Sequence, residues 1–244
     1  MEENKEKTVK KRQECDPAYQ WHIQDLYASD EVWEKDYEAL AGQAKELAAY
    51  EGRLKEGSEV FVEYMRKKEE FYRFYRDKML YLDAKPNAAH KKLAELEAAG
   101  KLKAVVTQNI DGLHQAAGSK KVLELHGSVH RNYCQSCGKL FDAEYILKSS
   151  GIPTCDECGG SIKPDVVLYE EGLDQQTLED AVYYISHADM LIIGGTSLAV
   201  YPAAGLIDYY RGNKLVLINK STTPLDNRAD LLIQGSIGAV LSEV

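Results

Sequence analysis

Four of the five cysteines in this 244-residue chain form two Cys-x-x-Cys pairs, a spacing that lets two thiolates bind one metal ion. Cys134 pairs with Cys137, Cys155 pairs with Cys158, and Cys15 stands alone. Four thiolates fill the tetrahedral shell of Zn²⁺ and leave no position for a reactive water, so the sequence predicts one structural zinc ion. The alternative, four free or disulfide-linked cysteines, is disfavoured because no secretory signal begins the chain.

Polar side chains follow a short apolar run at residues 103–107. Gln108 and Asn109 offer carboxamides and Asp111 offers a carboxylate, a set that suits a flat amide and a ribose. Ligands of α/β proteins bind outside the carboxyl ends of parallel strands, where these residues are expected to lie. The same residues also suit a turn held by Asn and Asp side chains, and spacing alone leaves both interpretations open.

A histidine follows a second apolar run, at residues 123–125. The imidazole of His126 has an ordinary pKa near neutrality, so it could act as a general base. The alternative is a histidine that makes a structural hydrogen bond, and nothing in its immediate surroundings excludes it.

Two further strand ends carry small or polar residues suited to phosphate and ribose oxygens. One is followed by Gly195, Thr196 and Ser197, with a helix start expected near Pro202, and the other ends in Asn219. Neither fits the G-x-G-x-x-G fingerprint or the Walker phosphate loop. Each cluster is a weak signal, but together they indicate a nucleotide cofactor.

The elements that must position these residues have the pattern of an α/β protein. Short runs rich in β-branched residues alternate with helix-length patterns, which predicts a Rossmann-like, mostly parallel sheet with helices on both faces. The expected strands are residues 103–108, 189–193, 214–219 and 230–234, and the expected helices between them are 174–186 and 201–210.

The first hundred residues read almost entirely as helix, with expected spans at 29–50, 60–82 and 87–99. Ser29 or Asp30 suits the start of the first helix, and Gly100 suits the end of the third. Seven aromatic residues crowd the second helix, and such a stripe is more often a packing face than a ligand site.

The composition bounds the class of protein. The net charge is −9 and no basic face is visible, so a nucleic-acid partner, including a zinc-ribbon interaction with DNA or RNA, is not expected. No apolar run approaches the roughly 20 residues of a membrane span. We therefore expect a cytoplasmic protein without a membrane partner.

Several motifs, taken together and in order, resemble the sirtuin family over about residues 63–244. They are TQNIDGLH at 107–114, ELHGSV at 124–129, the two cysteine pairs, KPDVVLYEE at 163–171, GGTSLAVYP at 194–202 and LVLIN at 215–219. Sirtuins are NAD-dependent protein-lysine deacylases. The resemblance implies a Rossmann-like domain, an inserted four-cysteine zinc module, and an acyl-lysine peptide lying as a strand in the cleft between them.

The resemblance also assigns roles. His126 is the general base of a reaction in which the acyl oxygen of the substrate attacks the ribose carbon, nicotinamide departs, and deacylated lysine and O-acyl-ADP-ribose result. The implied NAD-binding residues are Gln108, Asn109, Asp111, Gly195, Thr196, Ser197, Asn219 and Ile237. The implied peptide-binding residues are Val166, Val167 and Tyr169. Where the family often has Phe-Gly-Glu, this chain has Tyr169-Glu170-Glu171.

The N-terminal end departs from that family. Its opening strand, Gly-Ala-Gly-x-Ser loop and Ile-Pro-Asp-Phe-Arg segment are absent, and residues 12–57 instead resemble the helical N-terminal region of oligoendopeptidase F, without that family's His-Glu-x-x-His site. The expected domains are a helical segment at 1–60, a Rossmann-like domain at 61–131 and 161–244, and a zinc module at 132–160.

The expected function is thus deacylation impaired by the lost NAD loop. One alternative is a catalytically silent fusion that binds zinc and a peptide or NAD. Another is a mono-ADP-ribosyltransferase, because that reaction shares the first chemical step.

Overall fold

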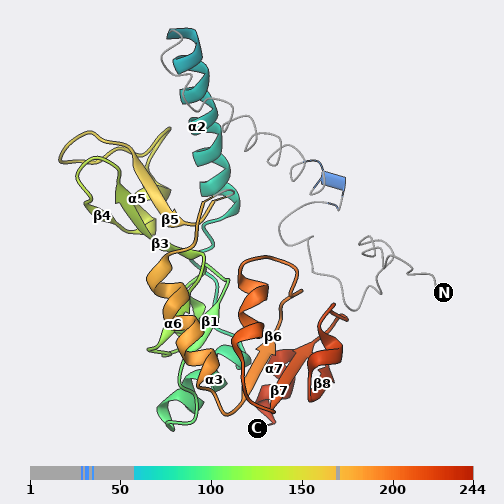
Figure 1. Cartoon of the computed structure of the whole chain (residues 1–244). Helices are drawn as coiled ribbons and strands as arrows, with labels where there is room; N and C mark the ends of the chain where they lie inside the picture. Colours follow the sequence, from blue (N-terminus) through green and yellow to red (C-terminus); the bar gives the residue numbers. More distant parts are fainter. Residues whose placement is uncertain (1–28, 30, 33–34, 36–57, 169–170, 244) are drawn as a thin grey trace. The chain divides into compact units, whose positions relative to one another are not determined.

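The computed structural model describes residues 29, 31, 32, 35, 58–168 and 171–243 (Figure 1). The chain divides into two compact units, Met1–Gly42 and Gln43–Val244. In the first unit, residues 31, 32 and 35 are helical, and the Val32 amide donates to Ser29 Oγ over 3.4 Å, as expected of a capping serine. The rest of the helix predicted for 29–50 lies outside the described residues, as does Cys15.

The first described element of the second unit is helix α2 (Ser58–Lys78), and several of its aromatic residues are used for packing. Tyr72 and Tyr75 are almost completely buried, and Phe71 stacks on Tyr75 with ring centroids 5.8 Å apart. The Tyr72 hydroxyl donates to the carbonyl of Ile162, a residue of the cysteine-bearing module. The aromatic stripe is therefore a packing face, as the sequence predicted.

Helix α3 (Ala88–Ala98) begins and ends where the sequence indicates. Asn87 and His90 form a capping box, in which the side chain of each residue bonds the backbone amide of the other. After the helix, Gly100 adopts a positive φ of 72°, which glycine tolerates without steric cost. Helix α3 then leads into strand β1 (Val105–Thr107), the short helix α4 (Leu113–Ala116) and strand β2 (Val122–Glu124).

The module that carries the cysteines is built on an antiparallel sheet with the strand order β4-β3-β5. Its elements are β3 (Gly127–Cys134), β4 (Leu140–Phe141), α5 (Ala143–Lys148) and β5 (Ile162–Val166). The strands extend beyond the expected range of 132–160, so β3 runs directly out of the segment that holds His126.

The remainder of the unit carries the second set of parallel strands. It comprises α6 (Gln175–Ser186), β6 (Leu191–Gly194), the 3₁₀ helix η4 (Ala203–Tyr209), β7 (Leu215–Asn219), η5 (Asp226–Arg228), β8 (Leu231–Gln234) and α7 (Ile237–Ser242). Among the described residues, β1 and β2 form one parallel sheet and β6, β7 and β8 form another.

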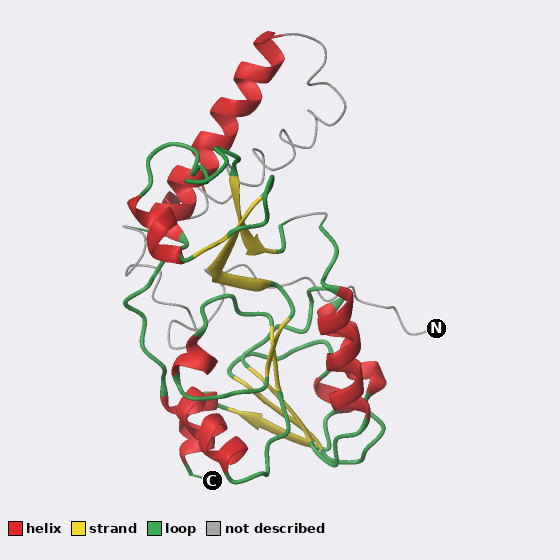
Figure 2. Cartoon of the chain, turned by 90° about the vertical axis from the view of Figure 1, so that its left-hand side faces the viewer, coloured by secondary structure: helices red, strands yellow, loops and turns green. Residues whose placement is uncertain are grey.

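Two apolar clusters flank these parallel strands, as the sequence predicted for an α/β fold. Residues of α6 and η4 pack with β2 and β6 in one cluster. Residues of α3 and α7 pack with β7 in the other. Figure 2 shows helices flanking the parallel strands in its lower half.

One predicted element has a different geometry. The helix expected at 201–210 is the 3₁₀ helix η4, in which Gly205 N–H donates to Pro202 O over 3.0 Å. Pro202 has no side-chain oxygen or nitrogen with which to cap the first turn, and Gly205 has low helix propensity. The helix start expected near Pro202 is therefore present, but it begins a 3₁₀ helix.

Candidate functional site

The carboxyl ends of three parallel strands meet through direct hydrogen bonds. Gln108, which follows β1, donates from Nε2 to Thr196 Oγ1 over 3.5 Å. Asn219, at the end of β7, donates from Nδ2 to the Thr196 carbonyl over 2.8 Å. Thr196 follows β6 by two residues, so it joins the two parallel sheets at one edge. The predicted polar residues of these strands are thus neighbours in space.

The segment after β1 makes the turn that the sequence allowed. Asn109 N–H donates to Thr107 Oγ1 over 3.0 Å, and Asp111 Oδ1 accepts the amide of Leu113 over 3.0 Å. Gly112 has a φ of 68°, and a Cβ there would lie 2.7 Å from the ring of His130. The Asn109 side chain is exposed and the Asp111 side chain caps the turn, so the turn and a ligand-binding role are compatible.

His126 lies beside this turn and is half-buried. Its Nδ1 atom is 3.1 Å from the Gln108 carbonyl oxygen, a pair that bonds when Nδ1 carries the proton. In that tautomer Nε2 is the unprotonated nitrogen and can accept a proton. The carbonyl of His126 accepts the amide of Val167 over 3.1 Å, which connects the histidine to the segment after β5.

The loop after β6 contains two residues with positive φ. Gly195 has a φ of 65°, and Leu198, which is buried, has a φ of 53°. Such a backbone is costly for a non-glycine residue and is found most often at functional sites. Leu198 N–H donates to Thr196 Oγ1 over 3.2 Å, which fixes the hydroxyl, while the Ser197 side chain is exposed.

Ile237 begins α7 and packs against the end of β6. A Cβ built on Gly194 would lie 2.2 Å from Ile237 Cδ1, so the two residues are in close contact. The predicted residue Ile237 thus lies beside the loop that contains Gly195, in the apolar cluster formed with α3.

Two of the three predicted peptide-binding residues lie next to His126. Val166 pairs with Gly127 in the β3–β5 ladder, and Val167 donates to the His126 carbonyl as described above. Tyr169 lies outside the described residues. A pocket of about 270 Å³ is lined by Val166, Val167 and Glu171, among others.

Lys163 and Glu171 hold the segment after β5; the sequence placed both in a motif but assigned neither a role. Glu171 Oε2 accepts Lys163 Nζ over 2.9 Å and the Leu168 amide over 3.0 Å. Burial alone would raise the pKa of Glu171, but these bonds outweigh it and hold the pKa below its usual value. Lys163 Nζ also donates to the Val166 carbonyl over 3.3 Å.

Arg131 was also missed, because its partner Asp165 lies 34 residues away in the sequence. Its Nη1 atom donates to Glu124 Oε2 and its Nε atom donates to Asp165 Oδ2, both over 2.7 Å. Glu124 ends β2 and Asp165 lies on β5, so Arg131 connects the parallel strands with the cysteine-bearing module. Local patterns of residue types cannot reveal such a bridge.

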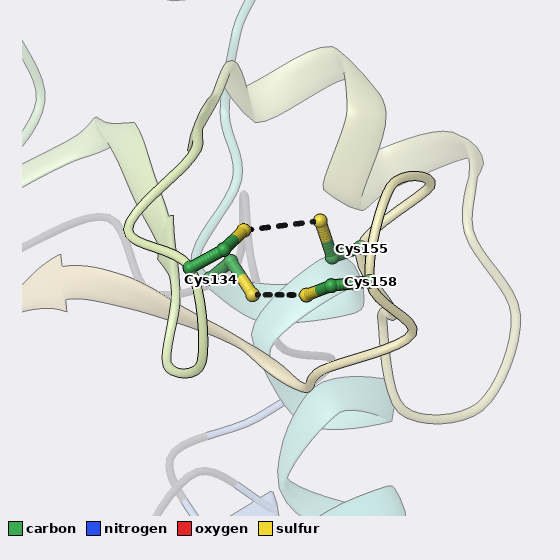
Figure 3. A group of neighbouring side chains, drawn as sticks. Cys134, Cys155 and Cys158 are labelled. Atoms are coloured by element: carbon green, nitrogen blue, oxygen red, sulfur yellow. Dashed lines mark hydrogen bonds between the residues drawn. The ribbon is translucent and has the colours of Figure 1, made fainter.

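The four paired cysteines converge in space, as Figure 3 shows for the labelled Cys134, Cys155 and Cys158. Their Sγ atoms all lie within 4.8 Å of one another. The Sγ atoms of Cys134 and Cys158 are 3.4 Å apart, and those of Cys137 and Cys155 are 3.7 Å apart. A donor set of four thiolates from two knuckles fits one tetrahedral zinc ion.

Hydrogen bonds around the cluster favour a thiolate at Cys134 and join the two knuckles. The backbone amide of Cys137 is the main group that lowers the pKa of Cys134, to about 6. Lys139 Nζ donates to Asp156 and Glu157, each over 2.8 Å, and so links the first knuckle to the second. Four thiolates fill the coordination shell of a zinc ion, so no open position is left for a reactive water. The role of the ion is therefore structural.

Comparison with known proteins agrees with this geometry. The model of the Sir2 family matches residues 36–202. An NAD-dependent protein deacetylase of Clostridium acetobutylicum is 67% identical over 177 residues, which are 72% of this chain and 72% of that protein. A protein of the same name from Staphylococcus aureus is 44% identical over 176 residues, again 72% of each chain.

Solved structures of Sir2 proteins have the same fold. A structure described as Sir2–p53 peptide–NAD⁺ has a TM-score of 0.68 and 45% identity, and the match covers 72% of this chain and 76% of that one. A structure of Sir2 bound to acetylated peptide gives the same values. In the part of the chain that the structure describes, no helix is long and apolar enough to cross a membrane.

Proposed function

Because the chain belongs to the Sir2 family, we propose that it is an NAD-dependent protein-lysine deacylase that releases nicotinamide and O-acyl-ADP-ribose. The observation that carries the proposal is the position of His126, whose Nδ1 atom faces the Gln108 carbonyl at the edge where polar strand ends converge. Its substrate is an acyl-lysine protein or peptide. A cytoplasmic location stays a prediction from the sequence.

In this proposal His126 is the catalytic base. Bound NAD supplies the ribose carbon from which nicotinamide departs. With Nδ1–H directed at the Gln108 carbonyl, His126 Nε2 accepts a proton from a ribose hydroxyl. Val166, Val167 and Tyr169 bind the substrate peptide through their backbone, as an added strand beside the histidine.

The proposed NAD site uses the polar strand ends. Amide, carboxylate and hydroxyl groups suit the nicotinamide, ribose and phosphate parts of the dinucleotide, and the hydrogen bonds from Gln108 and Asn219 to Thr196 support a common site. The residues are Gln108, Asn109, Asp111, Gly195, Thr196, Ser197, Asn219 and Ile237.

We further propose that turnover is impaired because the family's Gly-Ala-Gly-x-Ser loop is replaced by an N-terminal segment that resembles oligoendopeptidase F. Backbone donors of that loop would neutralise the diphosphate, and each charge-assisted hydrogen bond contributes about 1.5–3 kcal/mol. Loss of several such bonds would weaken NAD binding by roughly two orders of magnitude, since 1.4 kcal/mol is tenfold.

The test is nicotinamide release from an acetyl-lysine peptide at millimolar NAD, with products identified by mass spectrometry. We expect slow formation of O-acetyl-ADP-ribose, none in His126→Ala, and unchanged formation in His187→Ala, because His187 is exposed outside the site. Turnover equal to that of an intact family member would contradict the impairment. ADP-ribose attached to protein would instead indicate a mono-ADP-ribosyltransferase.

A further inference from the structure

Arg131 lies between the two segments that the proposed chemistry must hold together. His126 lies between β2 and β3. Val166 is the last residue of β5, and Val167 follows it. The bridge from Arg131 to Glu124 and Asp165 spans these same elements, with two N–O distances of 2.7 Å. We propose that Arg131 is a positioning residue that holds His126 against the peptide-binding backbone; this inference rests on the proposed function.

The two halves of the bridge differ in burial. The Glu124 side chain is 7% exposed, whereas Asp165 and Arg131 are 39% and 38% exposed. A buried carboxylate that loses its partner is left uncompensated, while a half-exposed pair contributes little. The ion pair between Arg131 and Glu124 therefore contributes most of the constraint, and the ion pair with Asp165 connects Arg131 to β5.

The contacts next to the bridge show what it constrains. Gly127 pairs with Val166, Ser128 pairs with Asp165, and the ladder then shifts register between Ser128 and Asn132. Arg131 thus lies inside the irregular part of the ladder, where the regular bonds between β3 and β5 are interrupted. The side-chain bridge joins the strands at this interruption, beside the hydrogen bond from Val167 to His126.

The geometry requires arginine. Arg131 uses two different nitrogen atoms, Nη1 and Nε, in directions fixed by the planar guanidinium. A lysine at this position carries one ammonium group and can satisfy one carboxylate well. Arg131→Lys should therefore restore the constraint only in part.

The experiment compares Arg131→Met, Arg131→Lys and the wild type by amide hydrogen exchange at Val167. We expect exchange about tenfold faster in the methionine variant, an intermediate rate in the lysine variant, and full zinc content in both. The matched control is Arg228→Met, since Arg228 pairs with the exposed Asp208 outside the site. Unchanged exchange at Val167 in the methionine variant overturns the inference.

Two further measurements separate this role from general stability and from the proposed function. Acetyl-lysine peptide should bind about tenfold more weakly to Arg131→Met while NAD affinity stays the same; equal weakening of both overturns a positioning role. If Arg131→Met does not fold, the double variant Glu124→Gln/Arg131→Met removes the orphaned charge and serves in its place. If the wild type binds no acetyl-lysine peptide, the proposed function fails, whereas exchange at Val167 still decides the role of Arg131.

Discussion

At the scale of single residues, two histidines beside the proposed site respond to pH. The rings of His90 and His114 lie edge to face with centroids 4.6 Å apart. Burial lowers the pKa of His114, and the neighbouring His90 lowers it further, while Asp111 and Glu124 oppose the change. Burial also lowers the pKa of His90. Folding therefore disfavours the charged form of both imidazoles.

The sign of the effect on stability follows from linkage. The folded-state pKa lies below the ordinary value of 6.5, so the unfolded chain binds more protons below that pH. The stability contributed by the neutral imidazole is present above about pH 6.5 and is lost as the pH falls further. We expect His114→Gln to reduce the drop in urea midpoint between pH 7.5 and 5.5.

The control for this prediction is His187→Gln, because His187 is exposed. Both variants keep the cysteines, so acid release of zinc affects them equally. An identical drop in His114→Gln and the wild type would show that the buried histidine does not set the acid sensitivity.

At the scale of elements, α2 is attached to the cysteine-bearing module by a tyrosine pair with unequal roles. Tyr72 donates to the buried Ile162 carbonyl, whereas the Tyr75 hydroxyl is buried with no hydrogen-bond partner among the described residues. Burial raises the pKa of Tyr72 to about 12. One hydroxyl stabilises the packing of α2, and the other does not.

A matched pair of substitutions tests this difference. Tyr72→Phe leaves a buried carbonyl unsatisfied and should lower the free energy of unfolding by about 1–3 kcal/mol. Tyr75→Phe removes a buried, unpartnered hydroxyl and should be neutral or stabilising. Urea denaturation of both variants is the measurement, and equal destabilisation would contradict the assignment.

At the scale of the whole molecule, local spacing predicted what depends on neighbours in sequence. The cysteine pairs, Gly100 at the end of α3, and strands β1, β6, β7 and β8 were predicted, because each depends on residues a few positions apart, whereas β3, β4 and β5 were not predicted as strands. The 3₁₀ geometry of η4 was missed, since the pattern marks a helix without fixing its hydrogen bonding. The Arg131 bridge was missed because Asp165 is 34 residues away.

Zinc binding at the four cysteines should also affect the molecule beyond the cysteine-bearing module. Cys134 and Cys155 belong to the buried cluster that includes Tyr75 of α2, Ile146 and Ile162. Structural zinc supplies folding free energy, so its removal should disorder the module and loosen α2. We expect a chelator to release one zinc per chain, to lower the melting temperature and to accelerate amide exchange in β3 and β5 before β7.

The parallel strands β6, β7 and β8 serve as the internal reference in that experiment, because none of the four cysteines belongs to them. Uniform acceleration across all of these strands would contradict a local role for the metal. So would a purified protein that contains no zinc and keeps the same melting temperature.

The close pairing of β3 with β5 limits which residues can replace Gly127. A Cβ at Gly127 would lie 1.9 Å from the carbonyl oxygen of Asp165, and Gly127 has a φ of 74°. Any side chain here, even a single methyl group, must push the strands apart beside His126. Gly127→Ala adds only one methyl group, yet it is thus among the substitutions that the protein can least accommodate.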